Sequence, residues 1–570
     1  MTEPTRLGPR PQQPTTGDLV LEYLSCVPDY LGRLLDLPVR VDALRKAGLF
    51  DPMRPDEGLR SLLAVRRFGP VAGAAQIAAQ RDGHALALVD ELGPLTFDQL
   101  DRRSNALARA WAARGLDHDS VIAVLARDHR GLVDCMLGAA KLGARLLLMN
   151  TGFSKPQLTD VVTREGVAAL AFDQEFSELL GDVPDEVPRY LAWLDDKDAA
   201  EADLPKLDEL IASTEDSPVS TPPKPGGLVL LTSGTTGTPK GAPRHVTGVL
   251  GATHFVERIP LRAGGANFIA SPMFHATGLS QLVLSLALGT TIVVRRRFDP
   301  EQTLRWIADN RCTGLVVVPT QLARILDRGP EVLGRYDTSS LRVIVTAGSL
   351  LAPDVSNRAM HAFGPVVYNL YGSTEVAVAT IATPEELLSA PGTVGRAPKG
   401  CVVRLYDKQN KRITGADTKG RIFVGSELAF GGYTGGGHKE IIDGLLSSGD
   451  VGHFDATGLL FVDGRDDDMI ISGGENVYPA EIENLLVERS DVADAVVIGV
   501  EDADFGQRLR AFVVLMQGAT VDEAELKAHV RANLARYKVP REVIFLDELP
   551  RNQTGKVLRR KLHEYEPEQR

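Results

Sequence analysis

Short hydrophobic runs alternate with helical patterns over most of this chain. Buried strands are predicted at 121–126, 145–148, 228–231, 315–318, 343–345 and 366–368. Between them, residues 98–113 and 132–142 carry apolar side chains at helical spacing, and Gly143 ends the second helix. Because short apolar strands separated by helices are typical of parallel sheets covered on both faces, the pattern predicts an α/β fold.

The two ends of the chain depart from this pattern. Residues 1–80 are interpreted as a helical N-terminal extension, with apolar residues at four-residue spacing from Leu19 to Leu31 and a helix-breaking Pro28. A membrane-surface helix is the alternative there, so peripheral membrane contact stays open. After Gly464 the pattern predicts a small α+β unit of about 100 residues, large enough to fold alone. Its expected elements are helices at 480–487 and 523–534 and strands at 495–500, 511–515 and 543–546.

Composition and charge narrow the class of protein. The 570 residues are 44% hydrophobic and 24% charged, as in ordinary globular proteins. The formal net charge of −12 disfavours nucleic acid as a partner, since binding it requires a basic surface. The four cysteines lie far apart, which indicates a reducing compartment. The apolar segment 279–294 is too short to span a membrane and is interpreted as a buried helix running into a strand. We therefore expect a soluble, cytoplasmic protein. The acidic segment 195–209 and the proline-rich segment 217–225 are expected to be surface loops.

The most distinctive motif follows the predicted strand 228–231. Residues 231–241 read Leu-Thr-Ser-Gly-Thr-Thr-Gly-Thr-Pro-Lys-Gly, which combines three glycines, five hydroxyl side chains and Lys240. Glycine lets backbone N–H groups turn inward, hydroxyls donate to phosphate oxygens, and the lysine adds positive charge. The segment lacks the Gly-Lys-Ser/Thr ending of a Walker A loop. It predicts a phosphate-binding loop of another kind.

With this loop and seven further motifs, the chain resembles the adenylate-forming acyl-CoA synthetases, a superfamily that includes peptide-synthetase adenylation domains and firefly luciferase. The matching stretches are 232–241, 271–275 (Ser-Pro-Met-Phe-His), 371–375 (Tyr-Gly-Ser-Thr-Glu), 392–395, 448–450 (Ser-Gly-Asp), 464–465, 472–481 and 554–556 (Thr-Gly-Lys). The resemblance implies a large N-terminal body of mixed and parallel sheets flanked by helices, with a small β-barrel-like part. It places an AMP-binding domain at 81–465 and a mobile C-terminal domain at 466–570, which turns about a hinge at Asp467.

The resemblance also implies the reaction and its participants. ATP and Mg²⁺ activate a small-molecule carboxylic acid to an acyl-adenylate, and coenzyme A then takes the acyl group. The resemblance assigns the phosphate contacts to Thr232, Ser233, Gly234, Thr235, Thr236, Gly237 and Lys240. It assigns the adenine and ribose contacts to Gly348, Ser349, Tyr371, Gly372, Ser373, Asp450 and Arg465. Catalytic positions are Thr374 at the α-phosphate, Glu375 as the magnesium ligand, His275 as the gate to the acyl pocket, and Lys556. Gly473 and Gly474 line the coenzyme A tunnel.

Fewer residues indicate the nature of the acyl substrate. Phe274, His275 and Ala276 lack the aspartate with which amino-acid-activating relatives hold an α-amine. A medium- or long-chain fatty acid is the main interpretation, because the stretches 277–288 and 316–320 are largely apolar where the family builds its acyl pocket. Aryl or branched acids, an acyl-AMP ligase that loads a carrier protein, and a non-catalytic lipid-binding homologue are the alternatives. No oligomeric state follows from the sequence.

Overall fold

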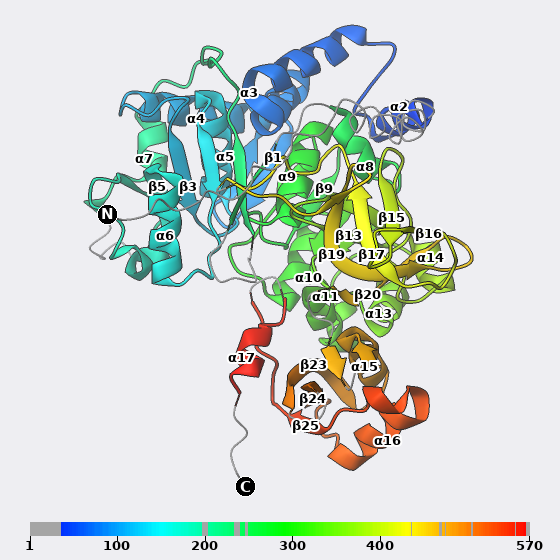
Figure 1. Ribbon diagram of the computed structural model, residues 1–570. Coiled ribbons are helices and arrows are strands. Elements are labelled where there is room, and N and C mark those ends of the chain that lie inside the picture. The colour runs from blue at the N-terminus through cyan, green and yellow to red at the C-terminus, as the bar shows by residue number, and fades with distance from the viewer. Residues whose placement is uncertain are drawn as a thin grey trace, which may run out of the picture.

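A large body and a smaller C-terminal lobe make up the chain, and Figure 1 shows the lobe below the body. The computed structural model describes residues 36–195, 203–232, 240–244, 249–434, 436–466, 470–472, 475–502, 506–552 and 555–565. The predicted helix near Leu19–Leu31 and the hinge residue Asp467 lie outside these ranges. The architecture of an α/β body with a small additional domain is as expected from the sequence.

The first sheet of the body has eight strands in the order β14-β13-β12-β11-β9-β10-β1-β2. Its strands are β1 (Leu86–Asp90), β2 (Gly93–Thr96), β9 (Ala266–Ile269), β10 (Thr291–Val293), β11 (Gly314–Val317), β12 (Val343–Ala347), β13 (Val367–Ser373) and β14 (Ala377–Ala382). The strands from β13 to β1 are parallel, and β2 and β14 add antiparallel edges. Every residue of β11 and β12 is buried, which explains their continuous hydrophobic sequence.

The second sheet of the body has six strands in the order β6-β5-β3-β4-β7-β8. Its strands are β3 (Val121–Leu125), β4 (Arg145–Leu148), β5 (Val167–Asp173), β6 (Arg189–Trp193), β7 (Leu228–Thr232) and β8 (Lys240–Arg244). All neighbours are parallel except β7 and β8. The phosphate-loop motif therefore joins two antiparallel strands at one end of this sheet.

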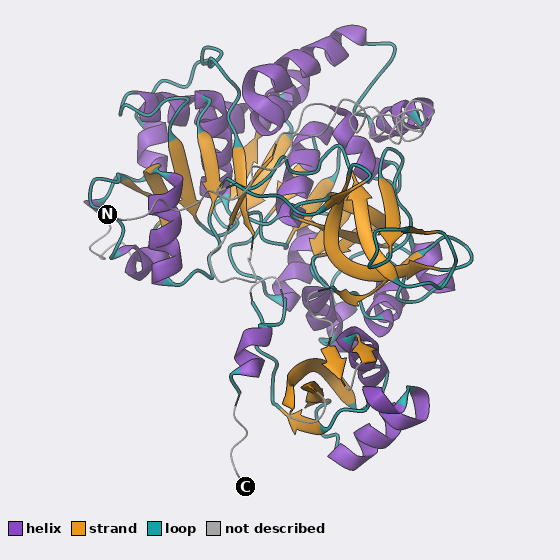
Figure 2. Cartoon of the chain, in the orientation of Figure 1, coloured by secondary structure: helices purple, strands orange, loops and turns teal. Residues whose placement is uncertain are grey.

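Helices cover both sheets, as Figure 2 shows. They are α2 (Leu37–Ala47), α3 (Pro55–Asp82), α4 (Phe97–Ala112), α5 (Arg130–Leu142), α6 (Lys155–Glu165), α7 (Leu207–Ala212), α8 (Thr253–Val256), α9 (Ala276–Leu288), α10 (Pro300–Asp309), α11 (Pro319–Leu326), α12 (Gly329–Leu333), α13 (Pro353–Phe363) and α14 (Pro384–Ser389). The segment interpreted as a helix running into a strand is α9 followed by β10. In the described ranges, no helix combines the length and apolar character needed to cross a membrane.

One sequence-based expectation is wrong in the body. The acidic segment 195–209 is not a loop throughout, because α7 begins at Leu207. This helix buries Leu207, Leu210 and Ile211, whose helical spacing runs past the end of the acidic stretch. Apolar burial therefore decides the local structure where composition indicated a solvated loop.

The third sheet is antiparallel, and the C-terminal lobe carries a fourth. The third contains β15 (Val402–Tyr406), β16 (Arg412–Ile413), β17 (Gly420–Gly425), β18 (Ile441–Ile442), β19 (Leu445–Phe454) and β20 (Leu460–Arg465). The lobe contains β21 (Ile470–Ser472), β22 (Glu475–Val477), β23 (Val492–Asp502), β24 (Gly506–Leu515) and β25 (Glu542–Phe545), with helices α15 (Pro479–Val487), α16 (Glu523–Asn533) and α17 (Arg559–His563). The lobe has its own hydrophobic cluster, centred on residues such as Ile482 and Val497.

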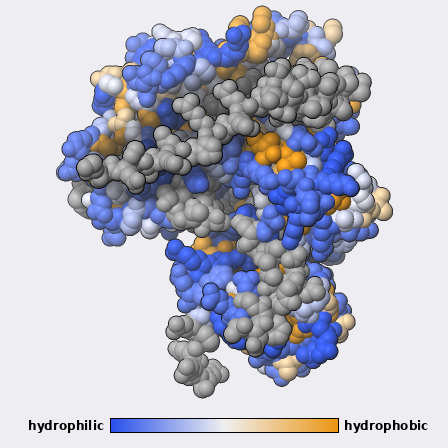
Figure 3. All heavy atoms as spheres, viewed as in Figure 1, coloured by the Kyte–Doolittle hydropathy of each residue, from blue (hydrophilic) through white to orange (hydrophobic). Residues whose placement is uncertain are grey.

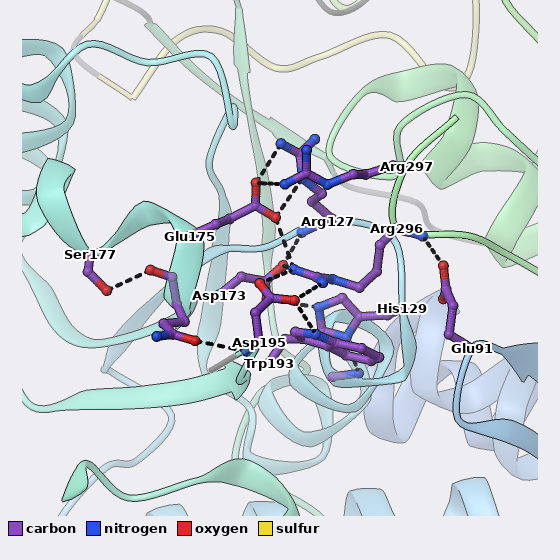
Figure 4. Close-up of polar contacts among 12 residues, drawn as sticks. Glu91, Arg127, His129, Asp173, Glu175, Ser177, Trp193, Asp195, Arg296 and Arg297 are labelled. Atoms are coloured by element: carbon purple, nitrogen blue, oxygen red, sulfur yellow. Dashed lines mark hydrogen bonds and ion pairs between the residues drawn. The ribbon is translucent and has the colours of Figure 1, made fainter. Parts of the chain in front are cut away.

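A partly buried polar network joins the two sheets of the body (Figure 4). Arg296, which follows β10, donates to Glu175 at 2.9 Å and to Asp195 at 2.6 Å, and these carboxylates follow β5 and β6. Nearby, Nε2 of His129 lies 2.8 Å from Oδ1 of Asp173, and both side chains are fully buried. A buried hydrogen bond such as that between His129 and Asp173 is electrostatically stronger than an exposed one. The network ties the carboxyl ends of strands from both sheets together.

The outer surface agrees with the charged composition. On the face shown in Figure 3, hydrophilic residues predominate over body and lobe, and hydrophobic residues form small separate patches. Hydrophobic side chains are otherwise concentrated in the cores between sheets and helices.

Candidate active site

A cavity of about 2140 Å³ lies between the body and the lobe and extends into the body. Many of the residues predicted for the site line it: Lys240, His275, Gly348, Ser349, Tyr371, Gly372, Ser373, Thr374, Glu375, Asp450, Arg465 and Lys556. Thr232 ends β7, and its side chain is not among those described. Ser233, Gly234, Thr235, Thr236, Gly237, Gly473 and Gly474 lie outside the described residues. The structure thus brings together predicted positions that are more than 300 residues apart in sequence.

The Tyr-Gly-Ser-Thr-Glu motif occupies the carboxyl end of β13, where the strand pairs irregularly with β14. A Cβ at Gly372 would lie 1.8 Å from the carbonyl oxygen of Ala377, so a side chain cannot be accommodated there. The register shift between Tyr371 and Gly372 falls at this close approach. Glycine therefore permits the turn that directs Thr374 and Glu375 to the cavity.

Glu375 is held by two hydroxyl donors. Ser373 Oγ donates to its Oε2 at 3.1 Å, and Tyr433 Oη donates to its Oε1 at 2.8 Å. Burial and the bond to Glu375 raise the pKa of the Tyr433 hydroxyl, which therefore stays a proton donor. Lys240 Nζ lies 5.3 Å from the centre of the Tyr433 ring. Tyr433 is a functional candidate that the sequence did not reveal, because only the glycines around it stand out as a signal.

A second polar cluster surrounds Asp450. The antiparallel register of β19 and β20 pairs Asp450 with Arg465, whose Nε lies 3.8 Å from Oδ1. Tyr371 Oη donates to Asp450 Oδ2 at 2.6 Å, and it lies 3.1 Å from Ser448 Oγ. Burial raises the pKa of Asp450, against the opposing influence of the Tyr371 hydrogen bond and the positive charges of Arg465 and Lys556. Tyr371 was expected to pack on adenine; the structure adds a hydrogen bond that fixes the carboxylate.

Two buried polar atoms at the cavity have no hydrogen-bond partner within the described part of the chain. They are Nε2 of His275 and Oγ of Ser349. His275 is the N-cap residue of α9, and its ring centre lies 4.5 Å from that of Phe274. Burial lowers the pKa of His275 to about 4, so the imidazole is neutral at physiological pH. Buried polar atoms are seldom left unsatisfied, which makes both atoms candidates for ligand contact.

The C-terminal lobe contributes Lys556 through a tight turn. The backbone N–H of Asn552 donates to the Lys556 carbonyl at 2.8 Å, and the Lys556 N–H donates to Asn552 Oδ1 at 2.9 Å. Within the turn, Gly555 has φ +76° and packs on Thr320 of α11, where an added Cβ would lie 2.3 Å from Oγ1. The turn therefore sits directly on the body, and Lys556 faces the same cavity as Glu375 and Asp450.

Two lobes enclose one cavity, and a lysine of the smaller lobe lines it together with carboxylates of the larger, as expected for an adenylate-forming enzyme. The AMP-binding enzyme family matches residues 75–434, and the AMP-binding enzyme C-terminal domain matches residues 481–556. The chain belongs to the AMP-binding enzyme family, and it is an AMP-forming acid–thiol ligase of the acyl-CoA synthetase class.

The chain is similar to ligases that are named for different acids. An indoleacetate–CoA ligase of Aromatoleum aromaticum is 34% identical over 81% of this chain and 91% of its own length. A fatty acid–[acyl-carrier-protein] ligase of Streptomyces coeruleorubidus is 30% identical over 85% of this chain and 94% of its own. The solved o-succinylbenzoate CoA synthetase of Bacillus subtilis, in complex with its acyl-adenylate intermediate, is 27% identical with a TM-score of 0.73 and covers 86% of this chain and 98% of its own.

Proposed function

We propose that this enzyme joins an aryl or branched carboxylic acid to coenzyme A at the expense of ATP. The observation that carries the proposal is that Lys556 lines the same cavity as Glu375 and Asp450. Similarity to ligases named for indoleacetate and o-succinylbenzoate favours a ring-bearing acid over the fatty acid expected from the sequence. A carboxylate oxygen attacks the α-phosphorus of ATP and releases pyrophosphate. The sulfur of coenzyme A then attacks the acyl carbon, loses its proton and expels AMP.

In the first half-reaction the residues supply position and charge. Carboxylic acids titrate near pH ~4, so the nucleophile is already ionised and needs no general base. The Asp450 carboxylate, fixed by Tyr371, offers two acceptor oxygens to the vicinal diol of ribose. Lys556 and Lys240 both line the cavity. In this proposal Lys556 supplies positive charge to the reacting carboxylate and α-phosphate, and Lys240 supplies it to the other phosphates.

A magnesium ion fits the donors at Glu375. In the described ranges, no group of three or more His, Cys, Asp or Glu side chains is placed to hold a metal. Mg²⁺ is commonly held by one or two carboxylates together with substrate phosphates, and the Glu375 carboxylate is fixed at the cavity by Ser373 and Tyr433. When bound, the ion would neutralise charge on the phosphate oxygens.

The second half-reaction requires the lobe to turn. The turn that carries Lys556 packs on α11. Coenzyme A must reach the acyl carbon from the side that Lys556 occupies, so Lys556 has to move away first. Rotation about Asp467, which would present Gly473 and Gly474 to the thiol, is our proposal for this step. It follows from the family resemblance of these residues.

A medium- or long-chain fatty acid is the second candidate substrate, because the part of the cavity along α9 is lined by apolar side chains such as Leu279 and Val283. Similarity to a fatty acid–carrier-protein ligase also leaves transfer to a carrier protein as an alternative to coenzyme A. A panel of acids, from acetate and long-chain acids to indole- and phenyl-substituted acids, separates these candidates. We expect ATP- and CoA-dependent thioester formation to be fastest with the ring-bearing acids. AMP release that ignores coenzyme A would contradict the proposal.

The role of Lys556 is tested by Lys556→Ala. We expect adenylation, measured by pyrophosphate release, to fall by ~10²–10³, the scale for losing one preorganised charge donor. Thioester formation from supplied acyl-adenylate should be retained. Lys527→Ala removes a lysine of the same lobe that pairs with Glu523 at 2.6 Å, and it should change neither half-reaction. Equal losses in both half-reactions of Lys556→Ala would contradict the assignment.

A further inference from the structure

The cavity extends well beyond the groups needed for nucleotide chemistry. From His275 it continues between α3 and α9, two helices that pack against each other. Side chains of α5, β4 and β7 close the other sides, among them Met136, Leu146 and Leu230. This inner part of the cavity, which we call the α3–α9 compartment, has mostly apolar walls.

The α3 wall consists of two helix faces, one on each side of a kink. Ser61, Val65 and Phe68 line the cavity before the kink, and Pro70, Val71, Gly73, Ala74, Ile77 and Arg81 line it after the kink. Within each half, the spacing of three or four residues places most of the lining positions on one side of the helix. The two polar members, Ser61 and Arg81, stand at the ends of the run, and the positions between them are apolar. The helix therefore presents an apolar stripe to the cavity.

A sharp kink allows both halves of α3 to contribute to the wall. Gly69 has φ 77° and ψ 177°, and Pro70 follows it. A Cβ at Gly73 would lie 2.8 Å from the backbone of Ala64, so the two halves pack closely beside the kink. The positive φ at Gly69 is readily adopted by glycine alone, so the kink depends on a glycine at this position.

Much of this wall precedes the part of the chain that matches the family. The family match begins at residue 75, whereas Val65, Phe68 and Val71 line the cavity before it. These residues belong to the N-terminal extension, to which the adenylation chemistry gives no role. The extension thus contributes directly to the substrate cavity.

The α9 wall changes in polarity along its length. Near its N-cap His275, the helix lines the cavity with Thr277 and Ser280, and further along with Val283, Leu284 and Ala287. Eleven residues separate Ala276 from Ala287, which corresponds to about 16 Å at the helical rise per residue. A bound acid would therefore keep its carboxylate near His275 and direct an apolar body away from it.

We propose that the α3–α9 compartment receives the distal part of the acyl group, and that the N-terminal extension sets its width through Val65 and neighbouring residues of α3. The substrate class is then a carboxylic acid with an elongated, uncharged apolar body, such as a ring carried on an alkyl chain. This inference rests on the proposed ligase function. It adds a specificity-determining wall that lies outside the catalytic residues.

The ω-phenylalkanoates provide a matched set of probes, from phenylacetate through 4-phenylbutyrate to 8-phenyloctanoate. In Val65→Trp and Ile77→Trp, the indole fills the compartment, since both side chains line it and are half-buried. We expect KM for 8-phenyloctanoate to rise about tenfold or more, with less than about a twofold change in KM for phenylacetate and for ATP. Leu63→Trp is the matched control, because Leu63 lies on the same helix, is 54% exposed and does not line the cavity.

Further variants and outcomes keep the test decisive. Val65→Ala and Ile77→Ala remove volume without overpacking, and they should shift the preference toward longer or bulkier acids. The inference is overturned if the wild type forms thioesters but Val65→Trp and Ile77→Trp show the same dependence of KM on acid length as Leu63→Trp. A uniform loss for all acids, with unchanged folding, would also overturn it. If the wild type forms no thioester with any acid, the proposed function itself fails.

Discussion

At the scale of single residues, Asp128 is a buried carboxyl group beside the segment that carries His275. Its Oδ1 accepts the backbone N–H of Met273 at 2.9 Å, two residues before His275. Burial raises the pKa of Asp128 to about 7, despite this hydrogen bond and the nearby positive charge of Arg127, and Asp173 adds to the rise. The folded protein therefore keeps a neutral Asp128 at pH values where an exposed aspartate is ionised.

This raised pKa makes stability depend on pH. An unfolded aspartate releases its proton near pH ~3.9, so between pH ~4 and ~7 only the unfolded state loses it, and stability falls as pH rises. Asp128→Asn retains an acceptor for Met273 and removes the titration. We expect its unfolding free energy to exceed that of the wild type by on the order of a few kcal/mol at pH 8 and to match it near pH 4, and thermal melting at the two pH values measures this difference. The exposed Asp185→Asn is the control. Parallel pH profiles of wild type and Asp128→Asn would show that the group does not titrate this way.

The residues predicted from sequence are those whose motifs are local. Tyr371, Glu375, Asp450 and Lys556 lie in short, specific runs, and all four meet at the cavity. Tyr433 was missed, because its bond to Glu375 joins positions 58 residues apart and leaves no local pattern. The contacts of Asp450 with Tyr371 and Arg465 were likewise unforeseen, since they form only between assembled strands.

At the scale of elements, the turn that carries Lys556 depends on close packing against α11. An added Cβ at Gly555 would meet Thr320 Oγ1 at 2.3 Å and would occupy a backbone conformation with φ +76°. Gly555→Ala should therefore push the turn away from α11 and lower adenylation about tenfold or more, the scale of a small misplacement of a catalytic group. Thioester formation from supplied acyl-adenylate should be spared. Rapid-quench measurement of the two half-reactions provides the readout.

Gly518→Ala separates packing from backbone strain. Gly518 lies in the same lobe with φ +84°, and an added Cβ there would meet nothing within 4 Å. Its substitution imposes similar strain without a clash against the body. If both variants lose adenylation equally, strain within the lobe and not contact with α11 is responsible.

Elements with strong periodicity were predicted well, and those decided by tertiary contact were not. The expected helix at 523–534 is α16, Glu523–Asn533, and the expected strand at 543–546 is β25, Glu542–Phe545. The kink at Gly69 is not predicted, although Gly-Pro is a local helix breaker, because the sequence indicates only a helical N-terminal extension as a whole. Similarly, α7 was hidden in an acidic segment, since its stability comes from burying Leu207 and Ile211.

At the scale of the whole molecule, family resemblance implied two lobes, but their mutual placement comes from contacts that no motif records. One such contact is ionic. Lys419 of the body lies 3.3 Å from Asp463, also of the body, and 3.6 Å from Glu481 of the lobe helix α15. Glu481 is in turn bound by Lys538 of the lobe at 2.7 Å. A turn of the lobe must break the pair of Lys419 and Glu481, which therefore favours the orientation in which Lys556 faces the cavity.

Lys419→Ala removes this tie and leaves Glu481 paired with Lys538 within the lobe. A partly exposed ion pair is worth up to about 1 kcal/mol, which corresponds to a shift of up to about fivefold between two orientations. We expect adenylation to fall about two- to fivefold, with thioester formation from supplied acyl-adenylate unchanged or faster, because the lobe turns more readily. The difference from the wild type should shrink at about 0.5 M salt, where such pairs are screened. Lys411→Ala, an exposed lysine of the body, controls for loss of charge. A loss that persists at high salt, or that falls equally on both half-reactions, would mean that Lys419 supports the fold of the body and not the orientation of the lobe.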